Sequence, residues 1–230
     1  MAVHSDDKSS TEIDNSKELP CLNILSVDFD WIMEPSIQIY NNLINQPQQI
    51  WLNILAECPG IQLQCDFMKY EQLCLYLGNI VKNLPNSSHF LYDFDHHGIL
   101  TSFDKWNIGQ QQYKLFNIDH HHDCGYPIKG DETYEDLRFP ITCANWMLTL
   151  AQAYPNCKDY IWICNKNSKD LVPDVSTPHL PSVYQTCDIN MINYIKFDYV
   201  FLCKSEPWVP PQYYPLYDSL THLLEKIIIK

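Results

Sequence analysis

Residues 113–125 read YKLFNIDHHHDCG, an apolar stretch that runs directly into an aspartate, three histidines and a second aspartate. The apolar part has the length and the aromatic and β-branched content of a buried strand. Four other stretches have the same character: LNILSVD ending at Asp28, HFLYDFD ending at Asp95, DYIWIC ending at Cys164 and DYVFLC ending at Cys203. We therefore expect five buried strands, three of which end in an aspartate.

Helical patterns lie between these strands. IWLNILAEC and FMKYEQLCLYLGNIVKNL separate the first two, PITCANWMLTLAQAY has a proline at a plausible first turn, and PLYDSLTHLLEKIII closes the chain. Strands that alternate with helices indicate an α/β fold, with a mostly parallel sheet flanked by helices. Ligands bind such sheets beyond the carboxyl ends of the strands. We expect the functional site there.

The chain has 230 residues, enough for one sizeable domain. We expect a disordered, polar and acidic tail over residues 1–20, without the apolar segment of a secretory signal, and one domain over residues 21–230. No apolar run approaches the roughly 18 residues that a membrane helix needs. Ten scattered cysteines without CxxC pairs favour reduced thiols of a cytoplasmic protein over a disulfide framework or a zinc ribbon.

The formal net charge of −13 argues against nucleic acid as a partner, because phosphates favour basic surfaces. It is compatible with a cationic substrate or a bound metal, since clefts of one sign concentrate ligands of the other. Acidity that only aids solubility is an equally good interpretation. The sequence leaves the oligomeric state open.

Aspartates and histidines gather after three of the predicted strands. In an extended chain, residues two apart point to the same side, so Asp28 and Asp30 share a side, and Asp119, His121 and Asp123 do so if their strand continues. His120 and His122 would then face away. DxD after a strand is often only a cap or a turn, and a histidine-rich loop can be incidental. The DHHHD cluster nevertheless favours a metal role.

Carboxylate and imidazole ligands suit a divalent metal such as manganese better than a structural zinc site. Carboxylates at this density would repel one another unless cations neutralised them. Two metals that share bridging carboxylates would do so, and would also activate a water molecule near neutral pH.

At these residues the chain resembles the arginases and the wider ureohydrolases, two-manganese enzymes that hydrolyse guanidinium groups to urea and an amine. Three stretches carry the resemblance. Asp119, His121 and Asp123 match the DAHxD motif; Asp28 and Asp30 in SVDFDWIMEP resemble SxDxDxxDP, with Glu34 in place of the last aspartate; and Asp95 and His96 in FDHH resemble the end of GGDH.

The resemblance implies two Mn²⁺ ions and a role for each matched residue. One ion would be held by His96, Asp119, Asp123 and Asp28, and the other by His121, Asp119, Asp28 and Asp30. Asp123 would orient the attacking hydroxide, and Glu206 in SEPWVPP would receive the guanidinium. The proton shuttle is unassigned, with His97 the nearest candidate and His120 or His122 behind it. Whether His96 or His97 is the ligand stays open.

The motif order departs from that of the arginases, because here the DxD motif comes before the DHHHD motif. We therefore expect an arginase/deacetylase-like sheet with permuted motif order. The segment after Asp123 lacks the pattern with which arginases bind the backbone of free arginine, and the chain is short, which implies an open pocket. These features resemble the peptide arginases of ribosomal peptide natural-product biosynthesis, which convert arginine in a precursor peptide to ornithine.

Three other functions stay open from the sequence. The first is a ureohydrolase of a small guanidino compound such as free arginine or agmatine. The second is a metal-dependent deacetylase of the same fold, which needs a single metal. The third is a binding module without activity. Trp208, Tyr213, Tyr214 and Tyr217 either line a peptide groove or pack the last helix onto the sheet, and packing is the more common role.

Overall fold

The computed structural model describes residues 20–34, 64–126, 141–168, 170–172, 180–206 and 208–229. The tail predicted over residues 1–20 falls, except for Pro20, outside this part of the chain. The helix predicted from IWLNILAEC, residues 50–58, also lies outside it.

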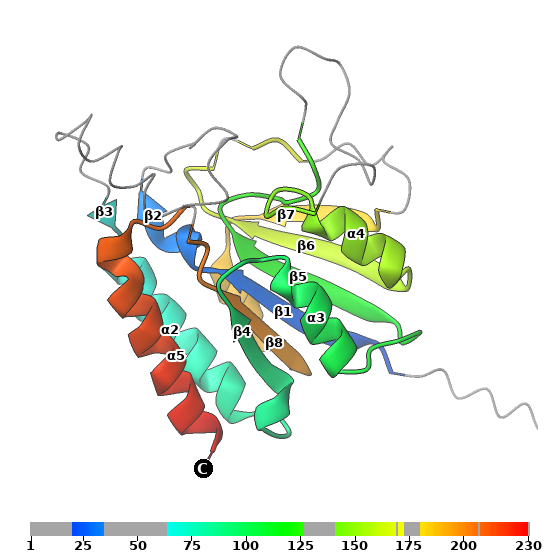
Figure 1. Cartoon of the computed structure of the whole chain (residues 1–230), viewed down its shortest axis with the longest axis horizontal. Coiled ribbons are helices and arrows are strands. Elements are labelled where there is room, and N and C mark those ends of the chain that lie inside the picture. The colour runs from blue at the N-terminus through cyan, green and yellow to red at the C-terminus, as the bar shows by residue number, and fades with distance from the viewer. Residues whose placement is uncertain are drawn as a thin grey trace, which may run out of the picture.

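One sheet of six strands forms the centre of the molecule, in the order β4-β8-β1-β5-β6-β7 (Figure 1). Every neighbouring pair in it is parallel, which confirms the predicted α/β class. The strands are β1 (Leu22–Asp28), β4 (Phe90–Asp93), β5 (Tyr113–Asp119), β6 (Cys157–Cys164), β7 (Ser182–Thr186) and β8 (Tyr199–Cys203). A second, two-stranded antiparallel sheet pairs β2 (Met33–Glu34) with β3 (Gln64–Cys65).

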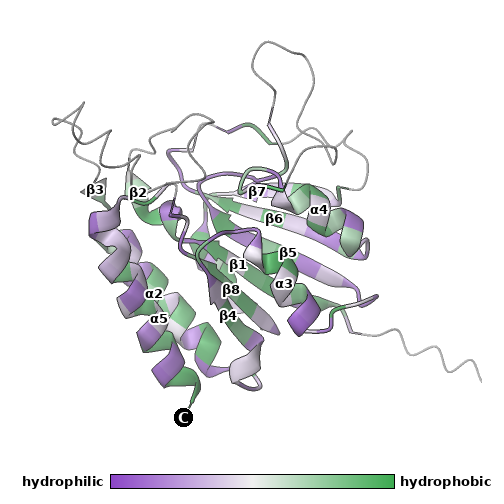
Figure 2. Ribbon diagram, in the orientation of Figure 1, coloured by the Kyte–Doolittle hydropathy of each residue, from purple (hydrophilic) through white to green (hydrophobic). Residues whose placement is uncertain are grey.

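Two pairs of helices cover the sheet (Figure 1). Core residues of α2 (Phe67–Lys82) and α5 (Tyr214–Ile228) pack against one face, and those of α3 (Gly98–Lys105) and α4 (Trp146–Ala153) pack against the other. Figure 2 shows apolar residues along the strands and polar ones on the outward sides of the helices. Short 3-10 helices complete the fold: η1 (Phe29–Ile32), η2 (Ser87–His89), η3 (Ile189–Tyr194) and η4 (Pro211–Tyr213).

Alternation along the strands divides the core into two layers, because successive side chains point to opposite faces. In β1, Leu25 and Val27 contact the layer under α2 and α5, whereas Ile24 contacts the layer under α3 and α4. Within the described residues, none of the helices combines the length and the apolar character needed to cross a bilayer.

Two elements of the sheet region were not predicted. β7 has the sequence SVYQT and is mostly exposed at the edge of the sheet, so it lacks the buried apolar run by which the other strands were recognised. α3 begins at the glycine of the DHHG stretch and has only eight residues.

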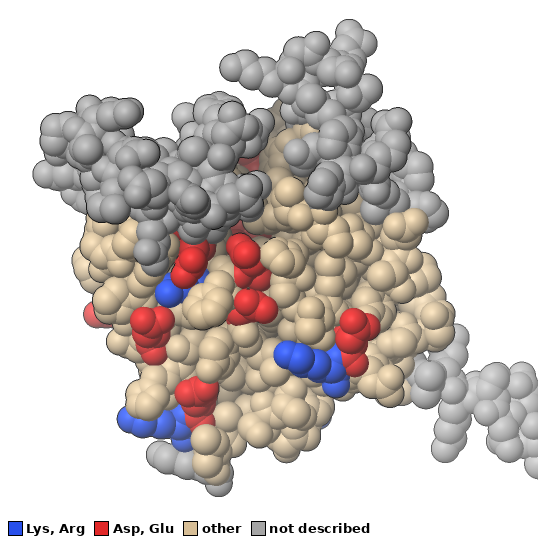
Figure 3. Space-filling model, in the orientation of Figure 1, with Lys and Arg blue, Asp and Glu red and all other residues tan. Residues whose placement is uncertain are grey.

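Parallel pairing brings the carboxyl ends of the strands to one edge. Asp28 of β1 and Asp93 of β4 are both register partners of Cys203 in β8, and Asp119 of β5 is the partner of Cys164 in β6. Acidic side chains gather on the viewed surface beside the carboxyl ends of β4 and β8 (Figure 3). This edge carries the candidate site.

Candidate metal centre

Four buried side chains converge at the carboxyl ends of the central strands: Asp28, His96, Asp119 and Asp123. Each contributes one ligand atom, and these atoms all lie within 4.8 Å of one another. Nδ1 of His96 lies 3.1 Å from Oδ2 of Asp28, 3.3 Å from Oδ2 of Asp119 and 3.2 Å from Oδ2 of Asp123. We call these four residues group A.

The surroundings of Nδ1 of His96 fit a metal ion. Three carboxylate oxygens stand within ion-pair distance of this buried atom, yet none of the described residues forms a hydrogen bond with it. Three buried carboxylates that face one another repel strongly unless a cation neutralises them. One nitrogen and three oxygens around a common point are a donor set that a divalent cation completes.

A second group, which we call group B, consists of Asp30, Asp119 and His121. Nδ1 of His121 lies 3.2 Å from Oδ2 of Asp30 and 4.0 Å from Oδ1 of Asp119. Asp119 therefore belongs to both groups, with Oδ2 toward His96 and Oδ1 toward His121. Asp28, which the resemblance implied would also bridge, falls only in group A of these two.

Turns, rather than continued strands, deliver the outer ligands. β1 ends at Asp28, and Asp30 lies in η1, where its backbone N–H donates to Oδ1 of Asp28 at 3.0 Å. β5 ends at Asp119, and the backbone N–H of His121 donates to Oδ1 of Asp119 at 2.9 Å. Asp123 has a φ of 53°, in the left-handed region that residues other than glycine rarely adopt. The alternation by which these residues were assigned to one side therefore does not extend beyond Asp28 and Asp119.

Neighbouring polar side chains orient three residues of group A. Oγ of Ser26 lies 2.7 Å from Nε2 of His96, the ring nitrogen that faces away from the carboxylates. Nδ2 of Asn117 donates to Oδ2 of Asp119 at 3.0 Å. The indole N–H of Trp146 donates to Oδ2 of Asp123 at 2.6 Å. Such outer contacts fix the orientation of metal ligands, and their loss commonly weakens metal binding.

The charges of the two groups perturb one another. Burial, together with the nearby charges of Asp28 and Asp119, raises the pKa of Asp30 to about 7, although His121 acts to lower it. Burial, together with Asp123 and Asp28, also raises the pKa of Asp119 well above its usual value. Burial acts to lower the pKa of His121, but the ion pair with Asp30 outweighs this effect and raises it to about 10. Without a metal, bound protons therefore neutralise part of the negative charge of the buried carboxylates.

His120 and His122 lie outside both groups. The ring of His122 stacks on Tyr126 at 4.4 Å between centroids, and its Nδ1 accepts a hydrogen bond from the backbone N–H of Cys124. The backbone N–H of His120 donates to Oδ1 of Asp30 at 3.4 Å. Burial lowers the pKa of both imidazoles to about 4, so both are neutral near pH 7.

The structure distinguishes His96 from His97. His96 is buried within group A, whereas His97 is exposed at the start of α3 and belongs to neither group. Glu206 is half-buried, and its Oε1 lies 3.4 Å from Nζ of the buried Lys204. The ring of Trp208 lies over His121, with 4.8 Å between centroids. Tyr214 and Tyr217 belong to the core, and Trp208 and Tyr213 pack against the same core cluster.

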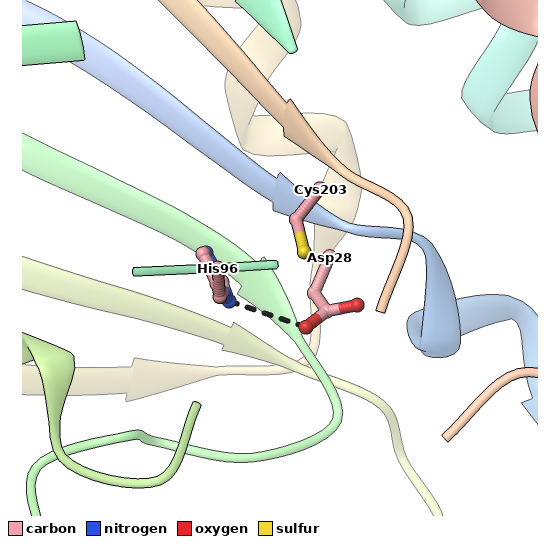
Figure 4. Close-up of side chains that lie close together, drawn as sticks. All are labelled: Asp28, His96 and Cys203. Carbon is pink, nitrogen blue, oxygen red and sulfur yellow. Dashed lines mark ion pairs between the residues drawn. The ribbon is translucent and has the colours of Figure 1, made fainter. Parts of the chain in front are cut away.

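Cys203 also reaches the centre, although it was not among the predicted site residues. Its sulfur lies within 4.8 Å of ligand atoms of Asp28 and His96, and the three side chains come from separate segments that meet at this edge (Figure 4). Burial raises the pKa of its thiol well above the usual value, with Asp28 contributing in the same direction. The available signal was its position at the end of a predicted strand; only the structure shows that this strand lies beside β1.

Comparisons of the chain with protein-family models, with curated proteins and with solved structures gave no match. The class of site therefore rests on its geometry, which is that of a buried carboxylate–imidazole centre able to hold metal ions.

Proposed function

We propose that the protein is a manganese-dependent hydrolase that converts arginine side chains within a peptide to ornithine and releases urea. The observation that carries the proposal is the sharing of Asp119 between group A and group B. A carboxylate placed between two ligand sets suits a two-metal centre, and the same residues carry the resemblance to the arginases.

Manganese is proposed because the donor atoms of groups A and B are carboxylate oxygens and imidazole nitrogens, a set that suits a borderline-to-hard divalent ion. Two such ions, when bound, supply an activated water and stabilise negative charge that develops on the substrate.

Three residues of the chain would orient the water, bind the substrate and transfer protons. Asp123, held by the indole of Trp146, would accept a proton from the attacking water and keep it oriented. Glu206 would pair with the guanidinium, whose planar fork matches a carboxylate. His97, which is exposed and directly follows His96 of group A in the sequence, would exchange protons with solvent.

Two features support a guanidinium substrate. Acidic side chains gather at this edge of the sheet (Figure 3), and a negative surface concentrates a cation. The ring of Trp208 lies over His121 of group B, and arginine stacks favourably on aromatic faces. A peptide substrate is proposed, rather than free arginine, because the chain lacks the arginase pattern that binds the backbone of the amino acid.

The test is a mass measurement on an arginine-containing peptide incubated with the protein and Mn²⁺. The expected product has lost CH₂N₂ per converted arginine, with one urea released for each. The peptide must contain no acetylated lysine, because removal of an acetyl group gives the same nominal mass loss. Asp159→Ala is the matched control for Asp119→Ala, since Asp159 pairs with Lys114 away from both groups.

Each outcome selects among the functions. Conversion of the peptide that is lost in Asp119→Ala supports the proposal. Conversion of free arginine or agmatine alone would make the protein a small-molecule ureohydrolase. Deacetylation of an acetyl-lysine peptide, with one metal per chain, would make it a deacetylase. Metal binding without turnover of any of these substrates would overturn the enzymatic function.

A further inference from the structure

Two cysteines meet where β6 and β7 end. The sulfur atoms of Cys164 and Cys187 lie 2.7 Å apart, and both residues are free thiols. The pairing between the strands runs from Asp159 with Ser182 to Ile163 with Thr186 at a constant offset. Cys164 is the last residue of β6 and Cys187 directly follows β7, so the same offset sets them opposite each other.

This placement suits a covalent bond between the two sulfurs. Adjacent strands lie about 4.8 Å apart, which falls within the range of about 4.4–6.8 Å between Cα atoms that a disulfide spans. Opposite positions of parallel strands direct their side chains to the same side of the sheet. The sulfurs therefore need only side-chain rotation to reach the bond length of about 2.05 Å.

The two thiols differ in access to solvent. Cys187 is exposed, whereas Cys164 is buried. A small oxidant in solution therefore meets Cys187 first. Cys164 lies behind it, in position to attack the sulfur of Cys187 once that sulfur has reacted.

We propose that Cys164 and Cys187 form a redox-active dithiol that closes to a disulfide by exchange with a low-molecular-weight disulfide. The sulfur of Cys187 attacks the small disulfide, forms a mixed disulfide and releases one small thiol. The sulfur of Cys164 then attacks Cys187 and displaces the second small thiol. Two protein thiols are oxidised, the small disulfide is reduced to two thiols, and these thiols take up the two protons.

The disulfide would close the segment that begins at Asn165 and ends at Thr186. Two of the residues that the structure describes in this segment contact the surroundings of the metal centre. Nδ2 of Asn165 donates to the carbonyl oxygen of Trp31 at 2.7 Å, and the hydroxyl of Tyr126 donates to Oδ2 of Asp170 at 2.6 Å. The cross-link would also tie the edge strand β7 covalently to β6.

The test incubates the full chain with mixtures of reduced and oxidised glutathione, alkylates the remaining thiols and maps the peptides by mass spectrometry. We expect a peptide linking Cys164 to Cys187 in the wild-type protein and in Cys157→Ser, a control with a cysteine at the other end of β6. Cys164→Ser should instead accumulate glutathione on Cys187, because the resolving thiol is missing. Cys187→Ser, a change at an exposed position, should leave Cys164 as a thiol.

Stability gives a second measurement. The two cysteines are 23 positions apart, and closing a loop of this size should raise the midpoint of thermal unfolding by about 5–10 °C. Dithiothreitol should reverse the shift, and neither single variant should show it. The proposal is overturned if oxidising glutathione produces no Cys164–Cys187 peptide, or if Cys164→Ser and the wild-type protein yield the same glutathione adduct.

Discussion

Nδ1 of His96 lies 3.3 Å from Oδ2 of Asp119, and the other oxygen of the same carboxylate accepts the backbone N–H of His121. Asp119 is the last residue of β5, whereas His96 lies just before the start of α3. The carboxylate thus connects the two ligand groups, and Asn117 donates to it from two residues earlier in the same strand. Changes around Asp119 should affect both groups together.

The hydrogen bond from Trp146 to Asp123 should set metal affinity. Trp146→Phe removes the donor at 2.6 Å and keeps an aromatic ring in the core, so we expect manganese to bind about 10–100-fold more weakly. Calorimetric titration with Mn²⁺ measures the change. Trp106→Phe is the control, because its indole donates to the carbonyl oxygen of Ser88 instead. Equal affinities of the two variants would contradict the role of Trp146.

The stability of the metal-free protein should fall as pH rises above about 6.5. Asp30 has a pKa of about 7 in the fold against 3.8 as its ordinary value, so the folded state holds an extra proton between these pH values and loses stability as that proton leaves. His121 adds stability that is fully present below pH 6.5, its ordinary pKa, and is lost as pH rises through about 10, its pKa in the fold. Asp30 and His121 act in the same direction, whereas His120 and His122, with pKa values lowered to about 4, oppose them below about pH 6.5. The net loss of stability should therefore appear above that pH.

Manganese displaces these protons, so its affinity and the stabilisation it gives should increase with pH. Thermal unfolding in EDTA and in excess Mn²⁺, across about pH 5 to 9, measures the difference. Asp30→Asn should remove the downward contribution of this carboxyl group to the curve below about pH 7. A difference that does not change with pH would show that protons and metal do not compete.

Gly98 should be required for the tight start of α3. A Cβ at this position would lie 2.5 Å from Oδ2 and 2.7 Å from Cβ of Asp93, so Gly98→Ala should cost about 1–3 kcal/mol of unfolding free energy. Gly78→Ala is the matched change in α2, where, among the residues described, the new Cβ would meet only Cδ1 of Ile227 at 3.4 Å. That variant should gain about 0.5–1 kcal/mol from helix propensity. Urea unfolding compares the two, and a smaller loss for Gly98→Ala than for Gly78→Ala would refute this explanation.

Lys204 should position Glu206 for the proposed substrate. Its buried ammonium lies 3.4 Å from Glu206 and 4.0 Å from the ring centroid of Tyr214. Lys204→Met keeps a flexible side chain among the aromatic rings and removes the charge, so we expect kcat/KM for an arginine peptide to fall several-fold at unchanged manganese content. Lys114→Met, which breaks a half-exposed ion pair with Asp159, is the control. Full activity of Lys204→Met would rule out this positioning role.

The sequence predicted the parts of the molecule that depend on burial. The runs ending at Asp28, Asp119, Cys164 and Cys203 are strands with those ends, because a strand covered on both faces needs a continuous apolar run. The run ending at Asp95 was two residues too long, since β4 ends at Asp93. Asp28 and Asp119, which end β1 and β5, were predicted to lie at one edge of the sheet because parallel strands have their carboxyl ends at the same edge.

What the sequence could not predict depends on turns and on neighbours across the sheet. Asp30 and Asp123 reach their groups through a 3-10 helix and a left-handed residue, neither of which follows from strand alternation. Cys203 meets Asp28 because β8 lies beside β1, and strand order was not deduced from the sequence. The choice between His96 and His97 also needed the structure, since one is buried and the other exposed only after α3 is placed.

The number of manganese ions bound per chain tests the central claim most directly. After equilibrium dialysis against Mn²⁺, elemental analysis should find two ions in the wild-type protein and in Asp159→Ala, one in Asp30→Ala, and fewer than one in Asp119→Ala. Asp119→Ala should remain folded, because it removes one of several mutually repelling buried carboxylates. A wild-type protein that binds no more than one ion at saturation, or an Asp119→Ala variant that still binds two, would contradict a two-metal centre built on Asp119.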